Sequence, residues 1–142
     1  MAVAEAISEA LRALVTARAQ GRCEYCQTPE AFATERFSIE HILPRVLGGL
    51  TEEQNLALAC QGCNGHKATK TTAFDPMTKE LASLFHPRQH IWTEHFKWSE
   101  DAWQIIGQTA EGKATVALLQ VNRSPLVNLR RAMIALEVHP PH

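Results

Sequence analysis

The sequence has little that would mark an exported or membrane protein. Its apolar runs are far shorter than a membrane span, and Glu5 and Glu9 interrupt the apolar residues near its start. No basic segment precedes them, so this stretch does not have the form of a signal peptide. We therefore expect a cytoplasmic protein that does not cross a membrane.

The chain also has almost no excess of charge of either sign. The formal net charge is −1, whereas a protein that attracts nucleic acid through its whole surface is strongly basic. Four cysteine thiolates around a divalent metal would lower the charge further, to roughly −3. Any contact with nucleic acid must then come from a local basic patch.

The composition is nevertheless that of a folded protein. The chain has 142 residues, of which 45% are hydrophobic and 20% charged, and it contains no internal repeat or low-complexity tract. We expect a single domain over residues 1–142, with an N-terminal helix at 1–21, a core at 22–72, and a hairpin with C-terminal helices at 73–142. The first helix is predicted to bury one face, formed by Ile7, Leu11, Leu14 and Val15, and to stop at Gly21.

The four cysteines form two matched C-x2-C pairs, Cys23 with Cys26 and Cys60 with Cys63. Each pair presents two sulfurs from one tight turn, and two such turns complete a tetrahedron around zinc. Disulfides or unrelated buried thiols are the alternatives, and the lack of an export signal weighs against disulfides. A site with four sulfurs has no open coordination position, so the pattern predicts a structural zinc and puts the chemistry elsewhere.

The residues between the two pairs have a recognisable order. Residues 37–40 alternate apolar and polar side chains, which predicts a short strand, and residues 44–54 contain the proline and glycines of a loop. Residues 55–60 predict a second strand that leads into the second cysteine pair. Residues 63–72 begin like a helix. The predicted order is therefore strand, loop, strand and helix.

Polar residues recur at fixed points of this order, in the pattern Glu40-His41, Pro44, Gly48-Gly49, Asn55-Leu56 and Cys60-x2-Cys63-Asn64-x2-Lys67. This pattern resembles the HNH endonuclease family in its zinc-knuckle form. The likeness covers residues 23–70, and residues 75–98 and 109–123 also resemble parts of small stand-alone bacterial HNH proteins. The resemblance implies an α+β fold with a zinc-stapled ββα-metal core, flanking helices and a C-terminal β-hairpin.

The resemblance also implies an activity, the metal-dependent hydrolysis of DNA phosphodiester bonds. In it His41 is the general base that activates water, Asn55 orders the loop, and Glu40 and Asn64 hold a catalytic Mg²⁺ or similar divalent ion. His66 is the alternative to Asn64 as a ligand. Elementary chemistry agrees, because a neutral histidine takes a proton near pH 7 and a hard cation with oxygen ligands stabilises developing charge.

Three basic residues are candidates for contact with phosphates, namely Lys67, Arg45 and Lys70. For each of them the alternative is a solvated surface charge. Lys67 is the strongest candidate because of its place in the motif.

The C-terminal half predicts further elements. Residues 90–109 alternate bulky and polar side chains around a turn at 99–101, which predicts a hairpin with Trp92, Phe96 and Trp98 as packing residues rather than base-stacking ones. The three nearby histidines form no matched ligand set, so we expect structural or surface roles for them (His86, His90 and His95).

Two helices are predicted to follow the hairpin. One begins near Thr109, and the other has Ser124 as N-cap and Pro125 as its first residue. The second carries an apolar stripe of Leu126, Leu129, Met133 and Leu136. Arg130 and Arg131 flank this stripe, and a solvated face is the expectation for both.

Two other functions stay open. The chain could be a non-catalytic zinc-stabilised module that binds nucleic acid or protein on an HNH scaffold, or a purely structural interaction domain. Glu40-His41 and Asn64 favour the enzyme, because a scaffold has no physical need of them. RNA is an alternative substrate to DNA. The sequence does not decide between nicking and double-strand cleavage, and a homodimer is one way to cut both strands.

Overall fold

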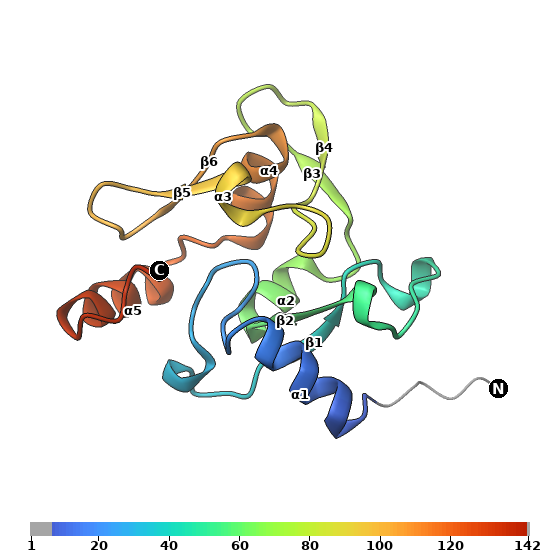
Figure 1. Cartoon of the computed structure of the whole chain (residues 1–142). Helices are drawn as coiled ribbons and strands as arrows, with labels where there is room; N and C mark the ends of the chain where they lie inside the picture. The colour runs from blue at the N-terminus through green and yellow to red at the C-terminus, as the bar shows by residue number, and fades with distance from the viewer. Residues whose placement is uncertain (1–6, 142) are drawn as a thin grey trace.

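The computed structural model of the chain describes residues 7–141 and has a mixed α+β architecture (Figure 1). Its elements are α1 (Glu9–Arg18), β1 (Ser38–His41), β2 (Leu56–Ala59), α2 (Gln61–Lys67), β3 (Thr72–Phe74), β4 (Leu81–Ser83), α3 (Trp92–His95), β5 (Phe96–Trp98), β6 (Ile105–Gly107), α4 (Ala110–Leu119) and α5 (Ser124–Ala135). The strands pair as three antiparallel hairpins, β1–β2, β3–β4 and β5–β6. The division into one domain stays a prediction.

The first helix is shorter than predicted. Part of the predicted helix, residues 1–6, lies outside the described residues, and α1 begins after Ser8, whose side chain accepts a hydrogen bond from the Leu11 amide at 3.1 Å. The helix ends at Arg18, before Gly21. Val15 is fully buried, but Leu14 is 40% exposed, so the prediction for Leu14 was wrong. The stripe that α1 buries is narrower than the apolar face predicted from its sequence, and α1 packs on β2.

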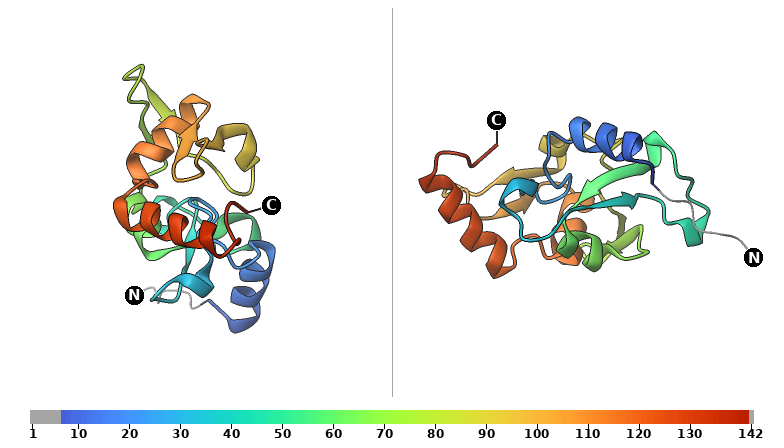
Figure 2. Two further views of the ribbon diagram at one scale, coloured as in Figure 1. Left: turned by 90° about the vertical axis from the view of Figure 1, so that its left-hand side faces the viewer. Right: turned by 90° about the horizontal axis from the view of Figure 1, so that it is seen from below.

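Strands β1 and β2 and helix α2 follow one another in the predicted order. The strands pair with Ser38 opposite Ala59 and His41 opposite Leu56. Cys60 then caps α2, and its sulfur accepts a hydrogen bond from the Cys63 amide at 3.4 Å. Figure 2 shows the hairpin between α1 on one side and α2 on the other. This β-β-α unit carries most of the residues singled out from the sequence.

The C-terminal half adds the other two hairpins and packs them around α4. The β3–β4 hairpin was not predicted, because its strands are three residues long and show no clear alternation. Residues 92–95, predicted as part of a strand, form the single turn α3 instead. The hairpin that follows confirms the predicted turn, and Trp92 packs against Phe96 and Trp98 with ring centroids 5.1 and 5.5 Å away. These aromatic residues are packing residues, as predicted.

Helix α5 differs from its prediction in three details. It begins at Ser124, and Arg123 occupies the cap position with an extended backbone, so Ser124 is not the N-cap. Leu136 is 62% exposed because the helix ends at Ala135, whereas Arg130 is 1% exposed. The Arg130 guanidinium donates to the carbonyls of Trp103 and Val121 at 3.0 and 2.6 Å. The prediction of a solvated Arg130 was therefore wrong, since these carbonyls replace water around its charge.

The hydrophobic core joins the two halves of the chain. It includes Val15 from α1, Leu56 and Leu58 from β2, and Phe85 and Phe96 from the C-terminal half. Within residues 7–141, no helix is long and apolar enough to cross a membrane.

Candidate functional site

The four cysteines meet in one buried cluster. Their sulfur atoms all lie within 4.8 Å of one another, and Cys26 Sγ lies 3.7 Å from Cys60 Sγ. Four sulfurs at about 2.3 Å from a tetrahedral zinc lie about 3.8 Å apart, whereas a disulfide would require about 2.05 Å. All four are free thiols. The cluster therefore fits a structural zinc, and in the described part of the chain it is the only group of three or more His, Cys, Asp or Glu side chains spaced to hold a metal.

The local turns explain how each pair presents its sulfurs. The amide of Cys26 donates to Cys23 Sγ at 3.5 Å, and the amide of Cys63 donates to Cys60 Sγ at 3.4 Å. Hydrogen bonds to sulfur favour the thiolate over the thiol. Hydrogen bonds within the cluster lower the pKa of Cys60, whereas burial raises the pKa of Cys23.

Arg123 adds a positive charge to this cluster, a role that no sequence pattern predicted. Its guanidinium lies 3.5 Å from Cys60 Sγ and 3.9 Å from Cys63 Sγ, measured from Nη2 and Nη1. Burial acts to lower the pKa of Arg123, but Cys63 and Cys60 raise it overall. Gly62 makes the approach possible, since a Cβ there would lie 2.2 Å from Nη2. Arg123 thus offsets part of the negative charge that four thiolates would place around zinc.

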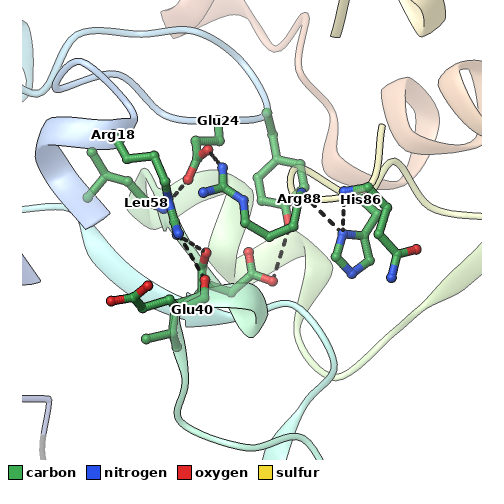
Figure 3. Close-up of polar contacts among 10 residues, drawn as sticks. Arg18, Glu24, Glu40, Leu58, His86 and Arg88 are labelled. Atoms are coloured by element: carbon green, nitrogen blue, oxygen red, sulfur yellow. Dashed lines mark hydrogen bonds and ion pairs between the residues drawn. The ribbon is translucent and has the colours of Figure 1, made fainter. Parts of the chain in front are cut away.

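Glu40 lies inside the molecule on β1. Its side chain, labelled in Figure 3, is buried, and the residue is 5% exposed. Its Oε1 accepts hydrogen bonds from Tyr25 Oη at 3.1 Å and from Lys67 Nζ at 2.7 Å. Burial raises the pKa of Glu40, and the charge of Lys67 opposes that rise. Among the described residues, the other carboxylate oxygen, Oε2, is buried without a hydrogen-bond partner. A cation would give this oxygen a partner, so Glu40 fits the metal-ligand role.

Lys67 is placed differently from the prediction. It is 1% exposed, and its Nζ donates to the Ile42 carbonyl at 2.9 Å as well as to Glu40. An ammonium group enclosed in this way does not face solvent, and the phosphate contact of Lys67 stays a prediction. The Lys67 ammonium group contacts both sequence neighbours of His41, namely the side chain of Glu40 and the backbone carbonyl of Ile42.

His41 stands at the end of β1, on the opposite side of the strand from Glu40. Its Nε2 lies 2.7 Å from Thr51 Oγ1, and the ring is partly exposed. The contact orients the imidazole by a hydroxyl from the loop between β1 and β2. Thr51 was not identified from the sequence, because an isolated threonine in a loop carries no motif.

Side-chain hydrogen bonds of Asn55 connect separate parts of the loop between β1 and β2. Its side chain accepts a hydrogen bond from the Leu43 amide at 2.8 Å and donates to the carbonyls of Leu43 and Leu50 at 3.0 and 2.9 Å. Gly49 lies against the same place, where a Cβ would meet the Leu43 carbonyl oxygen at 1.7 Å. These contacts close the loop that carries Thr51 to His41.

The remaining predicted residues lie on the outside of the β-β-α unit. Asn64 and His66 are half-buried on α2, and Arg45 and Lys70 are exposed. The structure thus brings together Glu40 and Lys67 through an ion pair, and His41 and Asn55 through one loop.

An acid–histidine pair on the first strand, a tethered loop and a four-cysteine cluster on a β-β-α unit define a recognisable class. Residues 23–78 match the family model described as HNH endonuclease. The resemblance predicted from the sequence is therefore confirmed, and the chain carries an HNH endonuclease domain over these residues. Comparisons with curated proteins and with solved structures gave no match.

Proposed function

We propose that the protein is a metal-dependent endonuclease that hydrolyses phosphodiester bonds of DNA. The observation that carries this proposal is the family match over residues 23–78, because that segment contains the acid–histidine pair, the central asparagine and both cysteine pairs. The burial and spacing of the four sulfurs support a structural zinc that holds the unit together.

In this proposal His41 is the general base that takes the proton from the attacking water. A neutral imidazole has a suitable proton affinity near pH 7. The 2.7 Å contact with Thr51 supports this role, because a base must be held in one orientation to act efficiently. Asn55 contributes indirectly as a positioning residue, through the loop that carries Thr51.

Glu40 and Asn64 are the proposed ligands of a catalytic Mg²⁺ or similar divalent ion, with His66 as the alternative to Asn64. Such an ion would supply charge stabilisation at the phosphate and at the leaving oxygen. The unpartnered Oε2 of Glu40 supports a cation at this place. Lys67 and Tyr25 hold the other oxygen, Oε1, and so fix the direction of the carboxylate. Arg45 and Lys70, both exposed, are the proposed phosphate contacts.

One observation favours a second candidate, a non-catalytic module that binds nucleic acid or protein. The carboxylate of Glu40 is already neutralised by Lys67 at 2.7 Å. A site whose acid is satisfied within the protein has less need of a metal. In that case the β-β-α unit would be a scaffold without catalysis.

The deciding experiment incubates supercoiled plasmid with zinc-loaded protein and Mg²⁺ or Mn²⁺. We expect nicked or linear DNA, and we expect its formation to be lost with His41→Ala and with a mild chelator. Intact plasmid under every metal, together with an unchanged gel shift for His41→Ala, would move the assignment to the binding module. Cutting that survives His41→Ala would mean that another residue is the base.

A further inference from the structure

A cavity lies between the C-terminal end of α1 and the loop of residues 85–92, apart from the proposed catalytic residues. Its volume is about 490 Å³, which is within the usual range for small-molecule sites. We call it the α1 cavity. Neither His41 nor Glu40 lines it.

The α1 cavity carries an excess of positive charge. Arg18 and Arg22 line it, and Arg88 pairs beside it with Glu24, the only carboxylate among the described residues of the lining (Figure 3). Glu24 is also engaged by the Leu58 amide at 2.9 Å. Three guanidinium groups therefore stand against one carboxylate that is already paired, and Glu53 acts on Arg18 from outside the lining.

Backbone carbonyls, which carry no net charge, accept hydrogen bonds from two of these arginines. Arg18 donates to the carbonyls of Glu53 and Leu56 at 3.0 and 2.7 Å, and Arg22 donates to the carbonyl of Gln27 at 2.9 Å. Burial lowers the pKa of Arg18 and of Arg22, and burial together with the charge of Arg18 lowers the pKa of Arg88 to about 10. Within residues 7–141, Arg88 Nε is also a buried donor without a hydrogen-bond partner. An anion bound in the cavity would add the negative charge that neutral carbonyls do not supply.

Ring side chains also line the cavity. Phe85, His90 and Trp92 line it, and Trp92 is fixed by a hydrogen bond of 3.0 Å from its Nε1 to the Tyr25 carbonyl. Aromatic faces bind nucleobases by stacking, and arginines bind phosphates. Both groups of a nucleotide thus find a partner in one cavity.

We propose that the α1 cavity binds a phosphorylated nucleoside, with its phosphate at Arg18 and Arg22 and its base against Trp92 and His90. The nucleotide is one unit of a nucleic-acid strand or a free nucleotide, which have the same chemistry. The strand form rests on the proposed function, because the strand would be the substrate cut at His41.

The test is equilibrium dialysis of the full zinc-loaded chain with dAMP, with deoxyadenosine, with inorganic phosphate and with a short single-stranded oligonucleotide. We expect dAMP to bind more tightly than either of its parts, with an affinity that falls as salt rises. Arg22→Gln should weaken dAMP binding by about tenfold or more, as expected for a lost hydrogen bond between charged groups. Tighter binding of the oligonucleotide than of dAMP would assign the strand form, and equal binding the free nucleotide.

The matched control is Arg131→Gln, because Arg131 is an exposed arginine that stacks on Trp103 at 4.2 Å and is absent from the cavity lining. It should leave dAMP binding unchanged. Equal losses in the two variants, no dAMP binding at millimolar concentration, or phosphate binding as tight as dAMP would each overturn the proposal. Thermal unfolding of each variant checks that it is folded.

The two proposals fail in different ways. His41→Ala should bind dAMP as the wild type does, and a loss of binding there would overturn the separate cavity. Wild-type protein that cuts plasmid but does not bind dAMP refutes only the cavity. Protein that binds dAMP but never cuts refutes only the nuclease.

Discussion

Replacing Gly62 by alanine should weaken zinc binding through Arg123, although neither residue is a ligand. The added Cβ would lie 2.2 Å from Nη2 of Arg123. Restoring about 3.0 Å requires the guanidinium to move by about 0.8 Å. Such a shift lengthens its 3.5 Å contact with Cys60 Sγ to roughly 4 Å, which weakens the charge-assisted hydrogen bond. Loss of an outer-shell partner typically lowers metal affinity 10- to 100-fold, or about 1.4–2.8 kcal/mol.

The substitution should not lower the stability of helix α2, although it lowers the affinity for zinc. Alanine is better than glycine in a helix interior by about 1 kcal/mol, so Gly62→Ala should not weaken α2. Gly65→Ala is the matched control, because Gly65 lies in the same helix and a Cβ there meets open space. Zinc affinity is measured by competition with a chromophoric chelator. Zinc affinity equal in Gly62→Ala and Gly65→Ala would refute the reasoning, and Arg123→Gln should reproduce the weaker binding.

Three further outcomes are expected from the β-β-α unit. Lys67→Met should destabilise the protein by about 3–5 kcal/mol in urea unfolding because it leaves the Glu40 carboxylate buried without its cation, whereas the double variant Glu40→Gln/Lys67→Met should recover most of that loss. An equal loss in both variants would contradict this. Burial raises the pKa of the Glu40 carboxyl above its ordinary value of 4.5, so the native state binds this proton more tightly than the unfolded state does. The contribution of Glu40 to the free energy of unfolding should therefore fall as the pH rises from 4.5 through the higher pKa of the native state. Glu40→Gln should remove this slope from the urea midpoints. Asn55→Ala removes three hydrogen bonds to the loop and should cost roughly 2 kcal/mol and speed proteolysis at residues 43–50; an unchanged cleavage rate there would argue against the tether.

Local patterns predicted the β-β-α unit well. The alternation before His41, the glycines and proline after it, and the two cysteine pairs are all short-range signals with a direct structural meaning. The hairpin β5–β6 and helix α4, which begins after its cap Thr109, were predicted for the same reason. The short strands β3 and β4 were missed because strands of three residues show too little of a period to detect.

Local patterns did not predict the surroundings of three charged residues. Lys67, Arg130 and Arg123 look like surface side chains in the sequence, yet the first two are almost fully buried and the third lies against two cysteine sulfurs. Their partners are far along the chain, as with Cys60 and Arg123, which are 63 residues apart. A repeat of apolar and polar residues within one helix or strand cannot predict a contact between residues so far apart in the sequence.

Short-range patterns in the amino-acid sequence were enough to identify the candidate site residues of this protein. Cysteine spacing and the order of polar residues around Glu40-His41 identify a metal cluster and an acid–histidine pair, because ligand spacing in a tight turn is a local property of the chain. Which charged groups are neutralised inside the protein became visible in the folded structure alone. The desolvation of a charge depends on everything that packs around it, as the ion pair of Glu40 with Lys67 and the arginines of the α1 cavity demonstrate.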